Sequence, residues 1–192
     1  MRLKINKSAG LEEIIKGCRK GKPKAQTELF NRYSGRLLGL CRRYVGSMDE
    51  AEDIMISGFM KIFEKIHQFK GDGSFEAWMT RIMVNESLTF IRRNKNMSVN
   101  ISIDVPDKEP DYSLAEASLD YEQILRMVDD LPVGYRTVFN LYVLEGYNHR
   151  EIGDLLNISE GASKSQLSRA RAQLKRNILS MEEKIKKQNH EK

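Results

Sequence analysis

Apolar residues recur at three- and four-residue steps along most of the chain, which is the spacing of one face of an α-helix. In the first half, these stripes predict helices over about 23–45, 49–66 and 75–93. Residues 69–74, with two glycines in three positions, break the pattern and favour a loop. Residues 99–105 alternate between apolar and polar positions, but one isolated strand is not stable, so we interpret them as extended linker. The pattern predicts an all-α fold.

The second half predicts a further group of helices. An apolar stripe begins near Leu119, and Pro132 stops that helix and starts the next one. Gly146 is expected to end this second helix. Residues 148–171 then follow the pattern of a helix-turn-helix motif, in which two short helices are joined by a tight turn.

Local hydrogen-bonding signals define that motif. Asn148 can cap a first helix, and Glu151, three residues on, can bond back to it. Asn157 lies at the turn, where a left-handed backbone is needed, and Ser159 can cap the second helix, about 160–177. A helix fits the DNA major groove, where its donor side chains read base edges and flanking cations hold phosphates. The polar face of the second helix carries Lys164, Ser165, Ser168, Arg169 and Arg171.

Charge and composition divide the chain into segments. Residues 96–117 carry one lysine against five carboxylates, a net charge of −4, together with two prolines and little helical periodicity. We interpret them as a flexible acidic linker between two small helical domains. The expected segments are a flexible N-terminus at 1–10, a first domain at 11–95, the linker at 96–117, a second domain with the helix-turn-helix at 118–181, and a polar, frayed tail at 182–192.

The overall composition bounds the classes of protein to consider. No stretch approaches the roughly 20 apolar residues that span a bilayer, so we expect no membrane insertion. Cys18 and Cys41 cannot build a disulfide framework, which fits a cytoplasmic protein. No metal-ligand spacing or nucleophile constellation occurs, so we expect no catalytic residue, no metal and no cofactor. The net charge of +5 is compatible with nucleic acid as a partner.

Four carboxylates open the helix that begins near residue 49. They are Asp49, Glu50, Glu52 and Asp53. Carboxylates at this end stabilise the helix dipole, which is one sufficient reason for their presence. The functional interpretation is a docking patch for a basic or polar partner, and metal binding is a weaker third interpretation.

Basic and polar residues gather toward the end of the helix over 75–93. They are Arg81, Asn85, Arg92, Arg93, Asn94 and Lys95, and cations also suit that end of a helix dipole. The preceding loop is flanked by Phe69 and Phe75, and aromatic rings with polar backbone groups bind unstacked bases of single strands well. Trp78 lies on the apolar stripe of the helix and is expected in the core.

Taken together, these residues resemble an extracytoplasmic function (ECF, group four) sigma factor of bacterial RNA polymerase. The resemblance covers about residues 11–178. In the first domain it rests on Asp49, Glu50, Ala51, Glu52, Asp53, Ile54, Phe59, Lys61, Phe63, Phe75, Trp78, Ile82, Asn85, Arg92 and Arg93. In the second it rests on Leu131, Pro132, Arg136, Val138, Phe139, Leu141, Glu145, Gly146, Glu151, Ile152, Leu155, Ile158, Ser159, Glu160, Gly161, Lys164, Ser165, Arg169, Ala170 and Arg171.

The resemblance implies three binding surfaces and no catalytic group. It implies docking on the clamp helices of core RNA polymerase by Asp49, Glu50, Glu52, Asp53, Ile54 and Phe59. It implies that the minus-ten promoter element is melted and read by Arg81, Asn85, Arg92 and Arg93, with a flipped base received by Lys70, Gly71, Asp72, Gly73 and Ser74. It implies that the minus-thirty-five element is read by Lys164, Ser165, Ser168 and Arg169, and we expect Arg171 to bind there by holding phosphates. An anti-sigma factor is a further expected partner.

Three positions depart from the family's usual residues. Gly153 replaces alanine, Ser163 replaces an apolar residue and Thr89 replaces an aspartate. We expect Gly153 to weaken its helix slightly, and we expect the three changes to affect promoter preference rather than class.

Other interpretations of the sequence remain open. A stand-alone helix-turn-helix regulator explains 148–171 but not the acidic helix, the glycine loop or the linker. A sigma-like decoy that binds a regulator fits poorly with the intact basic positions, and an enzyme with a metal on the acidic cluster fits least. The acidic linker either follows the path that nascent RNA later occupies, or its acidic residues only keep the linker soluble and extended.

Overall fold

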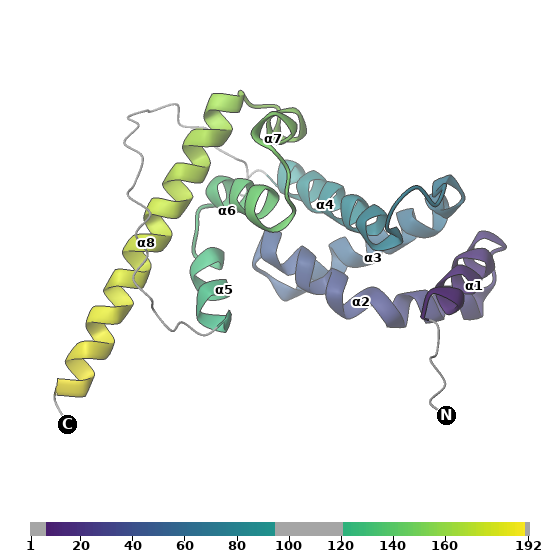
Figure 1. The fold of residues 1–192 in the computed structure, drawn as a ribbon, viewed down its shortest axis with the longest axis horizontal. Helices are drawn as coiled ribbons and strands as arrows, with labels where there is room; N and C mark the ends of the chain where they lie inside the picture. Colours follow the sequence, from purple (N-terminus) through teal and green to yellow (C-terminus); the bar gives the residue numbers. More distant parts are fainter. Residues whose placement is uncertain (1–6, 95–120, 191–192) are drawn as a thin grey trace. The chain divides into compact units, whose positions relative to one another are not determined.

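Helices account for every regular element that the structure describes. The computed structural model describes residues 7–94 and 121–190, and within these ranges it contains no β-strand (Figure 1). The chain divides into two units, Met1–Phe90 and Ile91–Lys192. The predicted all-α fold with two helical domains is confirmed. The acidic linker expected at 96–117, with the extended segment inside it, lies outside the described residues.

The first unit begins with a helix that sequence periodicity did not delimit. Its elements are α1 (Lys7–Arg19), α2 (Pro23–Val45), α3 (Met48–Lys65), the 3-10 turn η1 (Ile66–Gln68) and α4 (Phe75–Arg93). α1 starts inside the segment 1–10, which we expected to be flexible. Because Ile14, Ile15 and Cys18 are buried, α1 is a packed helix whose regular backbone extends toward the N-terminus.

The second unit ends in a helix longer than the sequence pattern predicts. Its elements are α5 (Tyr121–Asp129), α6 (Val133–Phe139), the π-helical turn η3 (Asn140–Leu144), α7 (His149–Leu156) and α8 (Glu160–His190). We expected the second helix of the motif over about 160–177 and a frayed tail at 182–192. The tail is rich in Glu, Lys and Gln, which are good helix formers, so α8 continues through most of it.

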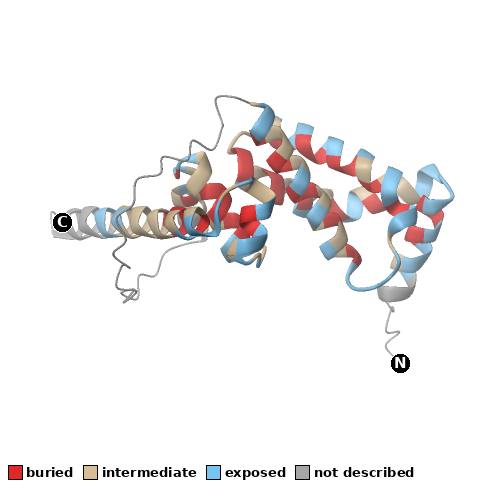
Figure 2. Ribbon diagram, turned by 90° about the horizontal axis from the view of Figure 1, so that it is seen from above, coloured by how far each residue is buried: buried red, intermediate tan, exposed pale blue. Residues whose placement is uncertain are grey.

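Buried residues recur along α2, α3 and α4 (red in Figure 2), and most of them are apolar. Leu29 and Leu37 of α2, Ile62 of α3, and Met79 and Leu88 of α4 are each at most 3% exposed. Burying one such side chain stabilises a fold by roughly 1.5–3 kcal/mol relative to leaving it in water. The outer sides of these helices remain exposed and can carry function.

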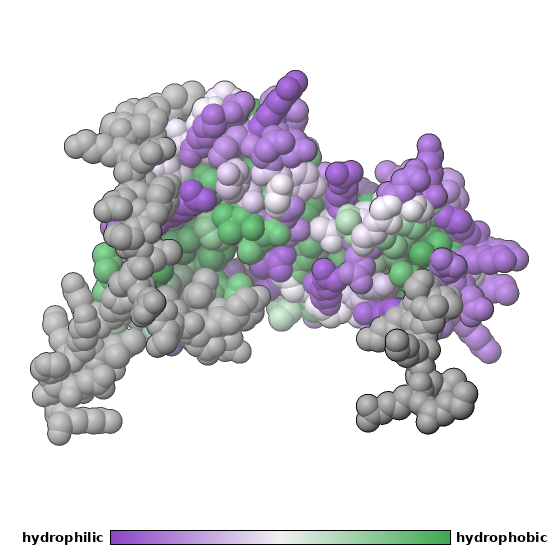
Figure 3. All heavy atoms as spheres, in the orientation of Figure 1, coloured by the Kyte–Doolittle hydropathy of each residue, from purple (hydrophilic) through white to green (hydrophobic). Residues whose placement is uncertain are grey.

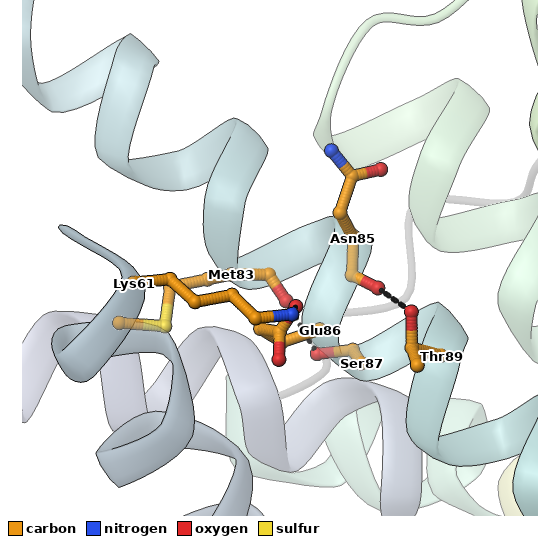
Figure 4. A network of polar contacts seen from close by, with 6 residues as sticks. All are labelled: Lys61, Met83, Asn85, Glu86, Ser87 and Thr89. Carbon is orange, nitrogen blue, oxygen red and sulfur yellow. Dashed lines mark hydrogen bonds and ion pairs between the residues drawn. The ribbon is translucent and has the colours of Figure 1, made fainter. Parts of the chain in front are cut away.

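α3 and α4 approach each other closely at a glycine. A Cβ at Gly58 would collide with the sulfur of Met83. One turn further along α3, Lys61 Nζ lies 2.5 Å from Glu86 Oε1 in a partly buried ion pair (Figure 4). The Ser87 hydroxyl donates to the carbonyl of Met83 at 2.9 Å. These contacts fix which face of α4 is turned to solvent.

Trp78 belongs to an aromatic cluster at the base of the glycine loop. Its ring centroid lies 5.5 Å from that of Phe75 and 5.7 Å from that of Phe69, and these two phenylalanines lie 5.0 Å apart. We expected Trp78 in the core, and the structure half-buries it. Aromatic pairs of this kind contribute about 0.5–1.5 kcal/mol beyond their buried area, so the cluster holds both ends of the loop.

The helix-turn-helix forms as its local signals predict. Asn148 Oδ1 accepts from the amide of Glu151 at 2.9 Å, and the Glu151 carboxylate accepts from the amide of Asn148 at 2.8 Å. Asn157 ends α7 with φ 57° and ψ 49°, in the left-handed region. Ser159 Oγ accepts from the amide of Ala162 at 3.0 Å in the first turn of α8. The predicted caps and turn are therefore confirmed.

The structure gives Gly153 a role in this turn. A Cβ at position 153 would lie 2.8 Å from the carbonyl oxygen of Ile158, a backbone atom that cannot move aside without opening the turn. Gly153→Ala is therefore expected to destabilise the chain, because overpacking costs about 1–3 kcal/mol and the better helix propensity of alanine gains only about 1 kcal/mol.

Denaturant unfolding of the full chain measures this change in free energy. Gly161→Ala is the matched control, because the nearest atom to its added Cβ is Ser159 Oγ at 3.9 Å. The control is expected to be neutral or slightly stabilising. A Gly153→Ala protein more stable than the wild type would contradict the close approach at this turn.

Candidate functional site

The outer face of α3 combines carboxylates with exposed apolar side chains. Asp49, Glu52 and Asp53 are exposed, and Glu50 is half-buried. Ser47 precedes the helix without a side-chain cap, so the carboxylates of the first turn act on the helix dipole. Glu52 and Asp53 lie beyond that turn, and helix stability alone does not account for them.

Two residues that we assigned to docking do not reach this surface. Ile54 and Phe59 are 2% and 3% exposed, and the Phe59 ring lies 4.7 Å from that of Phe30. Both side chains belong to the core, because they lie on the inner side of α3. The assignment of these two residues as contact residues is therefore wrong, although they position the helix.

The apolar part of the same face was not predicted from the sequence. Met48, Ile56 and Met60 are 52%, 52% and 68% exposed. Together with Glu52 they are spaced four residues apart, so they form one ridge along α3. We call Met48, Glu52, Asp53, Ile56 and Met60 the α3 ridge. The signal in the sequence was an apolar residue on each side of a carboxylate at helical spacing.

The glycine loop is exposed and locally constrained. All residues from Lys70 to Ser74 are exposed, and Gly71 and Gly73 have φ of 88° and 106°, a region that favours glycine. The amide of Gly73 donates to the carbonyl of Gly71 at 3.0 Å. Ser74 Oγ accepts from the amide of Ala77 at 3.4 Å, where α4 begins. The loop therefore presents backbone polar groups beside the aromatic cluster.

The solvent face of α4 carries the residues assigned to the minus-ten element. Arg81, Asn85, Arg92 and Arg93 are all exposed. Figure 4 shows the side-chain amide of Asn85 pointing away from the Lys61–Glu86 ion pair. Arg92 and Arg93 lie roughly 25 Å along the helix from its first residue. The candidate surface is therefore an extended strip that starts at the loop, not a compact pocket.

Thr89 bonds to its own helix. Its hydroxyl donates to the carbonyl of Asn85 at 2.7 Å (Figure 4). This bond engages the hydroxyl proton within the helix. Threonine is neutral, so the negative charge of the aspartate that the family usually has at this position is missing. The departure therefore makes the strip on α4 more positive.

The first turns of α8 carry the residues assigned to the minus-thirty-five element. Lys164 is exposed, and Ser165, Ser168, Arg169 and Arg171 are half-buried. Lys164 Nζ lies 2.8 Å from Glu160 Oε1, an ion pair that raises the pKa of Lys164 and lowers that of Glu160. The structure thus places all five residues on one helix, with the cations Lys164, Arg169 and Arg171 distributed over about two turns.

Two stacked aromatic rings contact residues of α8, which the sequence did not predict. The rings of Tyr142 and His149 stack with centroids 4.5 Å apart, and the guanidinium carbon of Arg171 lies 5.8 Å from the Tyr142 ring. His149 Nδ1 lies 2.9 Å from the hydroxyl of Ser163, which is fully buried. This hydrogen bond explains a serine where the family has an apolar residue, because the serine has a polar partner. We call Tyr142, His149 and Ser163 the brace.

Acidification is expected to destabilise the second unit through His149. Burial lowers the pKa of His149, and the nearby charges of Lys164 and Arg171 lower it further, against an opposing effect of Glu160. The folded state then binds its proton at lower pH than the unfolded state does, so stability is full above the usual pKa near 6.5 and falls as the pH drops below it.

The melting temperature of the chain at about pH 7.5 and about pH 5.5 measures this effect. In His149→Phe, which keeps an aromatic ring against Tyr142 but does not titrate, the loss of melting temperature between the two conditions is expected to be smaller. An equal loss in both proteins would assign the pH dependence to other groups.

Neither a cluster of metal ligands nor a membrane-spanning helix occurs in the part of the chain that the structure describes. Within residues 7–94 and 121–190 no group of three or more His, Cys, Asp or Glu side chains could hold a metal ion. No helix in these ranges is long and apolar enough to cross a membrane.

Family models match most of both units. The model of Sigma-70 region 2 matches residues 29–97, which include the α3 ridge, the glycine loop and α4. The model of Sigma-70, region 4 matches residues 121–174, which include the helix-turn-helix and the brace. The order of the two matched regions is the order that the resemblance predicted.

Sequence similarity to known sigma factors covers most of the chain. The ECF RNA polymerase sigma-E factor of Haemophilus influenzae is 26% identical over 179 residues, 87% of this chain and 94% of that protein. The ECF RNA polymerase sigma factor SigW of Bacillus subtilis is 26% identical over 181 residues, 88% of this chain and 96% of that protein. The sigma-E factor of Escherichia coli is 29% identical over 171 residues, 82% of this chain and 88% of that protein.

A solved structure shares the fold. The sigma factor RpoE of Bartonella quintana, crystallised with the anti-sigma factor NepR, has a TM-score of 0.51 and 21% identity, covering 80% of this chain and 96% of that one. The matches to both sigma-70 regions exclude the stand-alone helix-turn-helix regulator as an interpretation. The chain therefore belongs to the sigma-70 family, as an ECF sigma factor that directs RNA polymerase to promoters.

Proposed function

We propose that this sigma factor uses three separate surfaces, one for the polymerase and two for promoter DNA. The α3 ridge binds core RNA polymerase, the glycine loop with α4 opens and reads the minus-ten element, and α8 reads the minus-thirty-five element. The observation that carries the proposal is the α3 ridge. Exposed apolar side chains beside carboxylates suit a protein partner, since the same charges would repel DNA.

Opening of the minus-ten element follows from the strip on α4. Its arginines attract the phosphate backbone, and the exposed amide of Asn85 can bond to a base edge that melting has uncovered. Unstacking one base costs a few kcal/mol, and stacking or hydrogen bonding of the extruded base offsets this cost. No nucleotide hydrolysis enters this scheme, so we propose that the chain acts without catalysis or a cofactor.

Reading of the minus-thirty-five element follows from α8. Lys164, Ser165, Ser168 and Arg169 supply donors to base edges in the major groove, and Arg171, held against Tyr142, contacts a phosphate. When the polymerase holds both units, the overall affinity for the promoter exceeds that of either DNA contact alone. The second contact is then formed within one complex.

We also propose an anti-sigma partner and a cytoplasmic location, where the polymerase works. The second unit exposes Tyr142, Val143 and Leu144 of η3, at 36%, 44% and 47%, and Figure 3 shows hydrophobic surface over this unit. Such a patch suits a protein partner rather than water. An anti-sigma factor that covers this patch or the α3 ridge would block assembly.

Run-off transcription with core polymerase on genomic DNA tests the proposed function. We expect new start sites that depend on the chain, and we expect the chain to co-elute with core polymerase in gel filtration. Specific binding of the free chain to promoter DNA at moderate salt, with no effect on start sites, would contradict the proposal.

A further inference from the structure

Helix α1 is tied to the glycine loop by one arginine. Arg19 Nε donates to the carbonyl of Ile66 at 3.3 Å, and its terminal nitrogen donates to the carbonyl of Phe69. Both acceptors lie about fifty residues further along the chain, at the two ends of the segment that leads into the loop. α1 lies outside the ranges that the two family models match, so nothing in those matches assigns it a role.

A groove of about 570 Å³ lies between α1 and the loop. Its α1 side includes Ile15, Lys16 and Arg19, and its loop side includes Phe69 and Lys70. This volume lies within the range of small-ligand sites, which is roughly 300–1,000 Å³. The groove combines apolar and aromatic surface with three cations and one carboxylate, Glu12. The cations outnumber the carboxylate, so the groove can hold a nucleotide base together with its phosphate.

The loop side of the groove is held in shape from two directions. The ring of Phe69 packs against the other rings of the aromatic cluster, and its backbone carbonyl accepts a hydrogen bond from Arg19 of α1. The exposed segment that follows contains Gly71 and Gly73, both with positive φ, and glycines lose the most freedom when a loop becomes ordered. A clamp on the loop reduces the entropy that binding must overcome.

We propose that α1 forms one wall of the site that captures an unpaired promoter base, and that Arg19 is a positioning residue that holds the loop open for that base. This inference rests on the proposed function of the loop and adds α1 to it. Lys16 and Lys70 supply the positive charge for the phosphate of the captured nucleotide.

An abasic scan of single-stranded DNA tests the inference. The probes are oligonucleotides that cover the non-template minus-ten strand of a promoter found by run-off transcription, with one base at a time removed. Each probe is titrated onto the complex of the chain with core polymerase. The wild type is expected to lose affinity at one position, that of the captured base.

Arg19→Ala is expected to bind the intact probe about tenfold more weakly and to lose its sensitivity to the abasic site at that position. Arg19→Lys keeps the charge but cannot make both hydrogen bonds in the same geometry, so it is expected to give most of the same defect. Lys20→Ala removes a charge from the adjacent exposed residue and is expected to behave as the wild type. Polymerase affinity and melting temperature check that each variant is folded and assembled.

Gly73→Ala separates failure of this inference from failure of the proposed function. Its φ of 106° strains any side chain, so the variant distorts the loop itself. If Gly73→Ala loses the abasic sensitivity while Arg19→Ala and Arg19→Lys keep it, the loop captures a base without α1 and the inference is overturned. If all three variants keep it, the loop does not capture a base and the proposed function of the loop fails as well.

Discussion

Reversing two charges on α3, by Glu52→Lys with Asp53→Lys, is expected to weaken binding to core RNA polymerase about a hundredfold. Both side chains are exposed on the α3 ridge. Placing like charges opposite each other in an interface costs several kcal/mol, and the change also slows association by reversing the local field. Equilibrium titration of labelled chain with core polymerase measures the loss.

The matched control is Glu12→Lys with Glu13→Lys. These adjacent carboxylates are exposed on α1, so the control makes the same change in net charge away from the ridge. Glu52 and Asp53 lie past the first turn of α3, so their reversal leaves the carboxylates at the helix start in place. Equal affinity of the ridge variant and the wild type would remove α3 from the docking surface. Equal loss in both variants would indicate a net-charge effect alone.

Features set by neighbouring residues could be predicted from the sequence. The limits of α4 follow from a glycine loop before it and a change of periodicity after it. The capping box at Asn148 and the left-handed Asn157 depend on hydrogen bonds within a few residues, so their spacing alone identifies them. The order of helices around the motif was predictable for the same reason.

Features set by packing between distant segments could not be predicted. Periodicity places Ile54 and Phe59 on the apolar side of α3, and only the resemblance assigned them to docking. Periodicity did not predict that Ile56 and Met60, on another side of α3, are 52% and 68% exposed. The tie from Arg19 to the loop crosses about fifty residues, and a lone arginine on a helix carries no signal of its partner.

The structure explains why a serine stands at position 163, where the family usually has an apolar residue. Ser163 in the sequence is only a polar residue at a position that is usually apolar. In the structure its hydroxyl has a partner in His149, fourteen residues earlier. His149 also stacks on Tyr142, the ring that Arg171 lies over, so the departure bears on how α8 is held in place.

Arg169→Ala is expected to reduce transcription from promoters that depend on the minus-thirty-five element by about 5- to 150-fold, while binding to core polymerase stays unchanged. Loss of a bidentate contact to a base edge costs about 1–3 kcal/mol, and the loss is confined to the base that is read. Abortive or run-off transcription on promoter variants measures the effect at each base position.

Arg176→Ala is the matched control for this substitution, because it removes the same charge from an exposed position seven residues further along α8. If Arg169 only held a phosphate, Arg169→Ala would weaken every promoter variant equally and flatten the salt dependence of binding by about one counterion. If Arg169 reads a base, the substitution removes the discrimination between bases at one promoter position and leaves it unchanged at the other positions. Loss of polymerase binding in Arg169→Ala would refute the assignment to DNA, because α8 would then belong to the docking surface.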